Sequence, residues 1–250
     1  MEVSHVMLEP NEDSRPSVLT IGKFDGVHIG HQTILNKALS IKKEQEILTA
    51  ISFSPHPLWA LKQIEIYREM LTPRMEKERW LAHFGVNHLI ETAFTPKYAE
   101  TTPEQFVESH LSQLNLSHII VGSEFNFGKG RDSDVELLRD LCAPRNIGVT
   151  SVPVIETNHT KISSTNIRAF IRRGHFQEAE ELLGHPWYIT GTVKNGEMIG
   201  LDDYVLPETG GYQTDTTPAN ITNARTIQLD LPDGVHQIHI TSKLLKEVGY

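Results

Sequence analysis

The stretch S-V-L-T-I-G-K-F-D-G-V-H-I-G-H-Q, residues 17–32, decides the fold of this 250-residue chain. Its residues 18–21 form a short apolar run that predicts one buried strand. Glycines follow at positions 22, 26 and 30, where the backbone turns tightly or is approached closely. An apolar pattern with helical spacing begins directly afterwards, at Ile34 and Leu35. A strand, a glycine-rich turn and a helix start leave backbone N–H groups and the positive end of a helix dipole available for an anion.

Two histidines stand where this helix is expected to start. His28 and His31 are three residues apart, so their imidazoles would add hydrogen-bond donors for a phosphate. The stretch therefore predicts a nucleotide site. Two other interpretations stay open: the histidines merely solvate a helix start, or they bind zinc. The zinc interpretation needs a third ligand, and the stretch lacks the spacing and the glutamate of H-E-x-x-H.

Composition limits the classes of protein that fit. The formal net charge of −9 argues against a general nucleic-acid binder, because nothing supplies a basic stripe. The single cysteine, Cys142, excludes an internal disulfide framework and favours a reducing compartment. No secretory signal and no apolar run of membrane-spanning length is present. We expect a cytoplasmic protein with small-molecule substrates and without nucleic-acid or membrane partners; the sequence predicts no oligomeric state.

Strands and helices alternate over the first 186 residues. This alternation predicts an α/β fold, Rossmann-like, with a parallel sheet covered by helices on both faces. The expected strands are residues 3–8, 17–21, 47–53, 88–91, 118–121 and 148–155. The expected helices include residues 33–45, 72–85, 102–114, 163–174 and 175–183.

A second phosphate-binding pattern lies far along the chain, in K-I-S-S-T-N-I-R, residues 161–168. Ser163 and Ser164 are good N-cap residues, so capping alone explains one of them. Three consecutive hydroxyls with Arg168 one turn later are more than a cap requires. Hydroxyls, helix N–H groups and a guanidinium together favour binding of a phosphate.

Two shorter segments are compatible with a site for an aromatic ring. S-F-S-P-H-P, residues 52–57, follows a predicted strand, at the edge where open α/β sheets bind ligands. The loop G-S-E-F-N-F-G-K-G-R-D, residues 122–132, carries two phenylalanines between glycines. These aromatics are compatible with local packing, or with a face for isoalloxazine or adenine.

Four motifs, in this order, resemble a known family. G-K-F-D-G-V-H-I-G-H, residues 22–31, resembles the H-x-G-H signature of the nucleotidyltransferase superfamily and, in its extended form, that of the bacterial FAD synthetase family. Residues 52–57 are similar to the family's T-F-x-P-H-P segment, and residues 121–128 to its V-G-x-D-F-x-F-G motif. S-S-T-N-I-R is similar to the superfamily's second nucleotide-binding motif. Members of the family are usually bifunctional riboflavin kinase/FMN adenylyltransferases.

The resemblance implies transfer of AMP from ATP to FMN, giving FAD and pyrophosphate, with Mg²⁺ bridging the phosphates. It implies no protein residue as a metal ligand. Two positions depart from the family pattern: Glu124 replaces an aspartate and keeps its charge, and Asn126 replaces an arginine and loses a cation. The implied catalytic residues are His28, His31 and Arg168, and the implied ATP-binding residues are Gly22, Lys23, Phe24, Asp25, Gly30, Ser163, Ser164 and Thr165. The implied flavin-binding residues are Phe53, Pro55, His56, Pro57, Glu124, Phe125 and Asn126.

After Pro186 the pattern changes to short alternating segments with hairpin turns at residues 195–196 and 232–234. We predict a nucleotidyltransferase domain over residues 1–186 and a small all-β domain over residues 187–250. The second domain is expected to be a shortened, barrel-like remnant of the family's riboflavin kinase domain. The kinase motif P-T-A-N is missing; residues 217–220 read T-P-A-N and are predicted as a loop. We therefore expect FMN adenylyltransferase activity without riboflavin kinase activity.

Two alternatives stay open. The chain could act on a different phosphorylated substrate, such as a pantetheine, nicotinamide or polyol phosphate. It could also be a catalytically weak flavin-binding or regulatory protein. The sequence does not predict which redox state of the flavin is preferred, nor the role of the β region.

Overall fold

The computed structural model describes residues 1–157 and 160–244. The chain divides into two compact units, one formed by Met1–Arg68 and Arg74–Ile155 and the other by Glu69–Pro73 and Glu156–Tyr250. Within the described residues, no helix has both the length and the apolar character needed to cross a membrane. The cytoplasmic location stays a prediction.

The first unit is built on a parallel sheet of six strands in the order β1-β4-β3-β2-β5-β6. Every strand expected in this part of the chain is present, which confirms the predicted α/β fold with a parallel sheet. Because the strands are parallel and β1, β4, β3 and β2 are neighbours, their carboxyl ends follow one another along one edge. The strands are β1 (Glu2–Val6), β2 (Asp13–Ile21), β3 (Ile47–Ser54), β4 (His88–Ala93), β5 (Leu114–Gly122) and β6 (Gly148–Val152).

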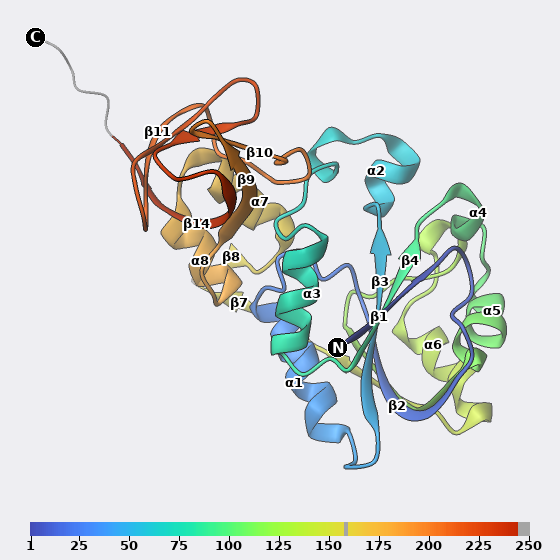
Figure 1. The fold of residues 1–250 in the computed structure, drawn as a ribbon. Helices are drawn as coiled ribbons and strands as arrows, with labels where there is room; N and C mark the ends of the chain where they lie inside the picture. The colour runs from blue at the N-terminus through green and yellow to red at the C-terminus, as the bar shows by residue number, and fades with distance from the viewer. Residues whose placement is uncertain (158–159, 245–250) are drawn as a thin grey trace, which may run out of the picture. The chain divides into compact units, whose positions relative to one another are not determined.

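Helices cover both faces of this sheet, as Figure 1 shows. On one face, α1 (Ile29–Ile41) and α3 (Arg74–His83) bury Leu35 and Leu81 against β2, β3 and β4. On the other face lie α5 (Pro103–Gln105), η2 (Phe106–His110) and α6 (Val135–Cys142), which pack on the alternate residues of the same strands. The remaining short helices are α2 (Pro57–Lys62), η1 (Glu65–Tyr67), α4 (Pro96–Ala99), η3 (Leu111–Gln113), η4 (Lys129–Arg131) and η5 (Ala143–Arg145).

Some boundaries differ from the predictions for clear reasons. Strand β6 ends at Val152 rather than at residue 155, because Pro153 lacks the N–H that would continue the ladder. Helix α1 begins at Ile29 rather than at residue 33, so the H-x-G-H residues themselves form its first turn. The apolar periodicity on which the prediction rested begins only at Ile34. The capping box between Thr102 and Gln105 is present at the start of α5.

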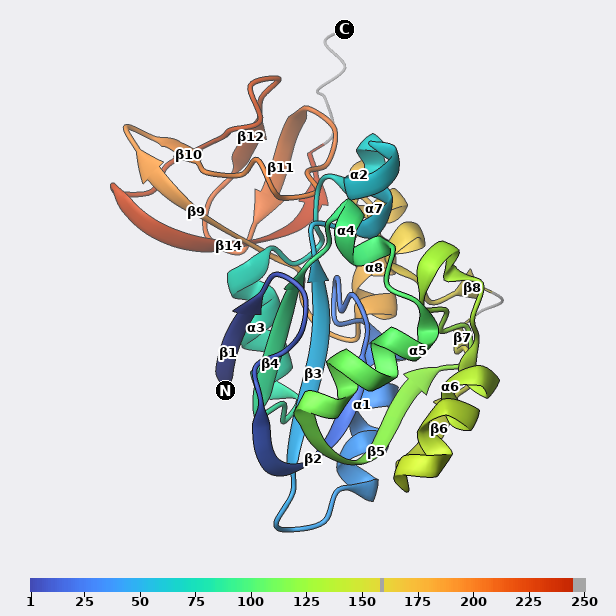
Figure 2. The same cartoon turned by 90° about the vertical axis from the view of Figure 1, so that its right-hand side faces the viewer.

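The second unit contains a closed antiparallel barrel in the order β10-β13-β12-β11-β14-β9 (Figure 2). The all-β prediction for this region is confirmed, but the loop predicted at residues 217–220 is wrong in part. Ala219 and Asn220 belong to a strand, because Ala219 and Ile221 alternate into the barrel interior. The barrel strands are β9 (Tyr188–Lys194), β10 (Glu197–Ile199), β11 (Gly210–Thr214), β12 (Ala219–Ile221), β13 (Ile227–Leu229) and β14 (Gly234–Lys243).

Two helices and a short hairpin belong to the same unit. These are α7 (Ser164–Arg173), α8 (Phe176–Leu183) and the pair β7 (Glu156–Thr157) and β8 (Thr160–Lys161). Trp187 is buried, and its indole Nε1–H donates to the carbonyl oxygen of Leu71, 2.9 Å away. Helices α7 and α8 belong to the same compact unit as the barrel. The division into a nucleotidyltransferase domain ending at residue 186 and a separate β domain stays a prediction.

Candidate active site

The turn between β2 and α1, residues 22–28, is the signature turn. Phe24 and Val27 have φ values of 51° and 38°, in the left-handed region that residues with a Cβ rarely adopt. Gly26, with φ of 85°, adopts the same region without steric cost. Such conformations persist only where the surroundings impose them, and they gather at functional sites. The residues packed around this turn therefore hold its backbone in a strained conformation, as is typical of functional sites.

The two signature histidines lie against each other at the start of α1. Their ring centroids are 3.7 Å apart and the rings are nearly parallel. A Cβ on Gly30 would lie 3.2 Å from the His28 ring, so a glycine at this position allows the imidazole to fold over the helix start. The first intrahelical bond is donated by the N–H of Gln32 to the carbonyl of His28. The N–H groups of the preceding helical residues therefore have no intrahelical acceptor and remain available to an anion.

The His31 imidazole is partly buried, packed between His28 and Phe24. Its Nδ1 is inaccessible and has no hydrogen-bond partner among the residues that the structure describes. Burial lowers the pKa of His31 well below 6.5, and the neighbouring charges of His28 and Lys23 lower it further. His31 is therefore a neutral imidazole at neutral pH. Its ring packs on Phe24, whose side chain is fully buried.

A buried ion pair supports the signature turn from α3. The ammonium of Lys77 lies 2.8 Å from Glu91 Oε1 and also donates to Ser52 Oγ, at 3.1 Å. The Ser52 hydroxyl in turn donates to the backbone carbonyl of Lys23, at 3.2 Å. The sequence prediction missed these residues. A signal was present, because Lys77 lies four residues before Leu81, on the face of α3 that packs against the sheet.

The P-H-P segment places a residue predicted to bind the flavin next to one predicted to bind ATP. His56 is the N-cap of α2, and its Nδ1 accepts a hydrogen bond from the Leu58 N–H at 3.1 Å. Its Nε2 lies 3.0 Å from Lys23 Nζ, and its ring stacks on Tyr67 with centroids 4.3 Å apart. Lys23, predicted for ATP, and His56, predicted for the flavin, are thus in direct contact.

A continuous row of aromatic rings links the end of β3 to the loop after β5. Successive ring centroids along the row lie 5.4–5.7 Å apart. Phe53 and Phe125, at its two ends, are half-buried, whereas the rings between them are buried. The structure therefore brings two of the predicted flavin segments together on the α5 face. In order, the row is Phe53, Tyr98, His110, Phe106, Phe127 and Phe125.

The other residues predicted on the flavin side are more exposed. Glu124 and Asn126 face solvent, and the Asn126 amide donates to the backbone carbonyl of Glu124 at 2.8 Å. Pro55 is exposed and Pro57 begins α2. In the signature turn, Gly22 packs against the Phe24 ring and Asp25 is buried.

The S-S-T-N-I-R motif lies in the second unit, at the start of α7. Ser163 is the N-cap and its hydroxyl accepts a hydrogen bond from the Asn166 N–H, which confirms the capping prediction for one serine. Ser164 and Thr165 stand in the first turn. Arg168 is 1% exposed and donates from Nη2 to the carbonyl of Glu69 at 3.2 Å. Its role in phosphate binding stays a prediction.

Comparison with known proteins identifies the family. A family model described as FAD synthetase matches residues 10–166. A curated protein of Listeria monocytogenes serovar 1/2a, named FAD synthetase, is 82% identical over 98% of this chain and 99% of its own length. The chain belongs to the FAD synthetase family. The match to the family model includes the signature turn, the P-H-P segment and the F-N-F-G loop, and it reaches into S-S-T-N-I-R.

Longer relatives in the FAD synthetase family carry a second activity in their names. Proteins of the same Listeria strain and of Bacillus subtilis, named bifunctional riboflavin kinase/FMN adenylyltransferase, are 35% and 31% identical to the chain. The chain covers 66% and 67% of their lengths. A crystal structure named macrolide-efflux protein, from Streptococcus pneumoniae, aligns over 100% of this chain and 93% of that one, with a TM-score of 0.84. At 24% identity, this likeness shows the fold alone.

Proposed function

We propose that the chain is an FMN adenylyltransferase, which converts ATP and FMN to FAD and pyrophosphate. The observation that carries this proposal is the stacked pair of His28 and His31 at the open start of α1. This arrangement places imidazole and backbone N–H donors together at the positive end of a helix dipole, which suits a polyphosphate. Membership of the FAD synthetase family supports FMN as the acceptor.

The reaction is a single displacement at phosphorus. A phosphate oxygen of FMN forms a bond to the α-phosphorus of ATP, and the bond from that phosphorus to the oxygen bridging to the β-phosphate breaks. Pyrophosphate leaves with the electron pair, and no covalent bond to the protein is required. The protein aligns two anions and stabilises the charge that develops on the departing pyrophosphate. His28, His31 and the N–H groups of the first turn of α1 serve this role.

Mg²⁺ would neutralise part of the triphosphate charge when bound. Among residues 1–157 and 160–244, no three histidine, cysteine or acidic side chains come together in a group that could hold a metal ion. Mg²⁺ is commonly held largely by substrate phosphates and water, which fits this site. Ser164, Thr165 and Arg168 are proposed to bind the β- and γ-phosphates through hydroxyls and a guanidinium.

We propose further that the β-barrel contributes no riboflavin kinase activity. The residues at 217–220 have the order T-P-A-N instead of P-T-A-N. Ala219 is buried in the barrel, and the Asn220 side-chain amide donates a hydrogen bond to Gln228 Oε1 on the neighbouring strand β13. Riboflavin would then be left unphosphorylated.

The test is product analysis with Mg-ATP and either FMN or riboflavin. We expect FAD and pyrophosphate from FMN, and neither FMN nor FAD from riboflavin. His28→Ala should lower kcat by about two to three orders of magnitude, as loss of a donor to developing charge does in other enzymes. His83→Ala, which removes an exposed imidazole from α3, is the control and should leave kcat unchanged.

Three outcomes would contradict the proposal. FAD formation by His28→Ala at the wild-type rate would remove the role of the histidine pair. Adenylyl transfer to nicotinamide mononucleotide or phosphopantetheine in preference to FMN would point to another substrate. Tight FMN binding without pyrophosphate release would indicate a flavin-binding protein.

A further inference from the structure

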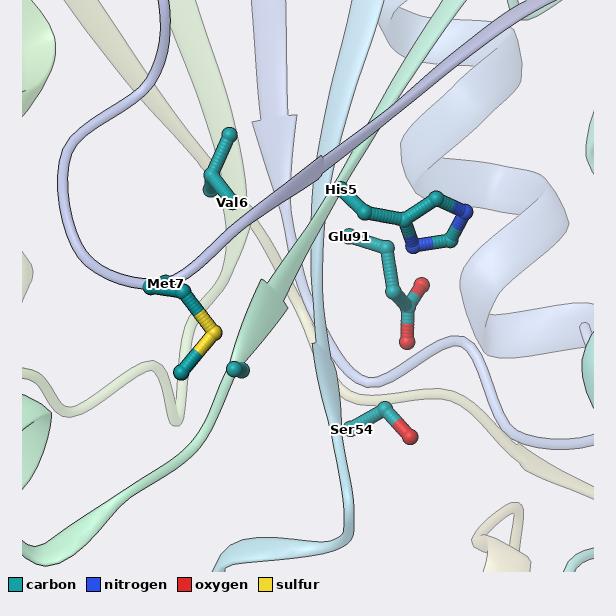
Figure 3. Close-up of a pocket in the computed structure, with 6 residues that line it drawn as sticks. His5, Val6, Met7, Ser54 and Glu91 are labelled. Atoms are coloured by element: carbon teal, nitrogen blue, oxygen red, sulfur yellow. The ribbon is translucent and has the colours of Figure 1, made fainter.

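A glutamate stands behind each of the two phosphate-binding motifs, and the two differ in how their carboxylate oxygens are engaged. In the first unit, Glu91 Oε1 pairs with Lys77, which supports the signature turn. Glu91 Oε2 has no hydrogen-bond partner within the described residues, and the side chain lines a pocket of about 160 Å³ at the ends of β1, β4 and β3 (Figure 3). In the second unit, both carboxylate oxygens of Glu69 accept from arginines. Glu69 is therefore engaged in holding its neighbours.

Glu69 is clamped by two arginines from different parts of the second unit. Arg172, on α7, donates from Nη2 to Oε2 at 2.9 Å. Arg225, in the turn between β12 and β13, donates from Nη1 to Oε1 at 2.6 Å. The Glu69 side chain is only 18% exposed, so solvent ions screen these charge-assisted bonds weakly. The clamp therefore joins the segment 69–73 to both α7 and the barrel.

The backbone of Arg225 indicates that its side chain is needed at this position. Its φ is 60°, in the left-handed region that favours glycine or asparagine. Hydrogen bonds fix the turn, because the Arg225 N–H donates to the Thr222 carbonyl at 3.2 Å. Arg225 also donates from Nη2 to the carbonyl of Tyr204 at 2.6 Å, on the same barrel. A strained residue of this kind persists where its contacts impose the conformation, and here those contacts are Glu69 and Tyr204.

The carbonyl of Glu69 is fixed by the peptide group to which it belongs. This carbonyl and the N–H of Met70 are parts of one planar peptide unit. The Met70 N–H donates to the Asp203 carbonyl at 2.7 Å, and the Met70 carbonyl accepts from the Val205 N–H at 2.9 Å. The orientation of the Glu69 carbonyl is therefore set by hydrogen bonds to residues 203–205 as well as by the clamp on its side chain.

The Glu69 carbonyl accepts a hydrogen bond from Arg168 Nη2 at 3.2 Å. A guanidinium is planar with its N–H groups in fixed directions, so anchoring one of them sets the directions of the others. Helix α7 fixes the backbone of Arg168, one turn after Ser164 and Thr165, and Glu69 fixes the far end of the side chain. Three guanidiniums share a single carboxylate in this cluster, so Glu69 holds them together without cancelling the positive charge that attracts a polyphosphate.

We propose that Glu69 and Arg225 are positioning residues for adenylyl transfer, which orient the guanidinium of Arg168 toward the β- and γ-phosphates of ATP. The inference rests on the proposed function, which assigns these phosphates to Arg168. Glu69 and Arg225 act through Arg168 and not on the reacting atoms. The barrel thereby has a role in the reaction without the kinase motif, because it supplies Arg225 and the backbone acceptors that fix Glu69.

The test compares Mg-ATP with AMP, which lacks the β- and γ-phosphates, by titration calorimetry on the full chain without FMN. Arg225→Ala should bind Mg-ATP about tenfold more weakly, the lower end of the range for loss of a hydrogen bond to a charged group, and should bind AMP like the wild type. In steady-state assays, KM for ATP should rise about tenfold while KM for FMN stays unchanged. Arg225→Lys, which keeps the charge, should bind Mg-ATP more tightly than Arg225→Ala.

Three further variants show whether the effect passes through Arg168. In an Arg168→Lys background, which lacks the guanidinium fork, Arg225→Ala should change the affinity for Mg-ATP less than twofold. Arg173→Ala removes an equal charge from an exposed position on α7, so it is the control and should change that affinity less than twofold. Glu69→Gln, which keeps the size of the side chain, should show the same selective loss for Mg-ATP, and it decides if Arg225→Ala does not fold.

The outcomes separate this inference from the proposed function. Unchanged affinity for Mg-ATP in both Arg225→Ala and Glu69→Gln would overturn the inference, and so would equal weakening of Mg-ATP and AMP. A tenfold effect of Arg225→Ala that persists in the Arg168→Lys background would also overturn it. Each of these results leaves the proposed function standing as long as the wild-type protein forms FAD from FMN. Absence of FAD formation by the wild-type protein would overturn the proposed function, whereas the comparison of Mg-ATP with AMP does not depend on FMN.

Discussion

The buried pair of Lys77 and Glu91 should behave as one stabilising unit, and Lys77→Met tests this. Both side chains are less than 10% exposed and their charged atoms are 2.8 Å apart. Methionine keeps the length of the lysine but leaves the Glu91 carboxylate buried without its counter-charge. Breaking a buried pair in this way costs about 3–5 kcal/mol of the free energy of unfolding. For a protein of this size, that corresponds to a fall in Tm of about 6–20 °C.

The double variant Lys77→Met with Glu91→Met gives the sharper result. Replacing both partners of a buried ion pair by apolar residues of similar volume is often neutral or stabilising. We therefore expect the double variant to regain most of the Tm lost in Lys77→Met. Thermal unfolding followed by circular dichroism measures the effect, and hydrogen exchange of peptides from β3 and β4 assigns it to the first unit.

A control on the same helix separates a buried pair from an exposed one. Arg74 and Glu78 form an ion pair one turn apart, with the arginine 64% exposed. Arg74→Met should cost less than about 1 kcal/mol, because exposed pairs contribute little. If the losses in the two single variants, Lys77→Met and Glu91→Met, simply added in the double variant, the two side chains would not be coupled and the reasoning would fail.

Three further outcomes follow from single residues. Gly30→Ala should lower kcat at least tenfold, because the added Cβ would lie 3.2 Å from the His28 ring and displace it. Tm should not fall, because alanine favours a helix more than glycine does. An unchanged kcat would contradict this role of Gly30. Because the pKa of His31 is lowered in the folded protein, the unfolded chain takes up a proton at His31 below about pH 6.5 while the folded chain does not. The free energy of unfolding therefore falls as the pH falls, by up to about 1.4 kcal/mol per pH unit. Urea titrations from about pH 7 to 5 should show a shallower slope for His31→Gln, and equal slopes would be inconsistent with a buried neutral imidazole. Burial raises the pKa of Cys142 to about 11, so alkylation by iodoacetamide should be slow in the folded protein and fast after unfolding; rapid native alkylation would contradict its burial.

Much of the fold could be read from local patterns in the sequence. The six strands of the sheet are short apolar runs separated by helical periodicity, and both signals are local. Caps were equally readable, as at Thr102 and Ser163, because a side chain there bonds a backbone group only a few residues away. The start of α1 was misplaced because His28, Ile29 and Gly30 give no apolar periodicity, although they form the helix start.

The side chains that support the signature turn cannot be predicted from local sequence patterns. Lys77 and Glu91 are fourteen residues apart, and Ser52 is twenty-five residues from Lys77. Only the order of the strands in the sheet brings them together beneath the signature turn. The same holds for the aromatic row, whose ends, Phe53 and Phe125, meet through rings from other segments. A sequence pattern identifies the residues of such a site one by one, but it carries no signal for contacts set by strand order.

In the signature turn, the same buried side chains hold the backbone conformation and position the catalytic imidazole predicted at His31. Phe24 and Val27 hold backbone conformations that cost about 1–3 kcal/mol each. Both side chains are fully buried, and burial of such a side chain contributes about 1.5–3 kcal/mol, which offsets that cost. The apolar residues of the turn therefore hold the backbone in a shape that it would not adopt alone. Because the Phe24 ring also packs on His31, the same burial that stabilises the strained turn orients the imidazole over the helix start.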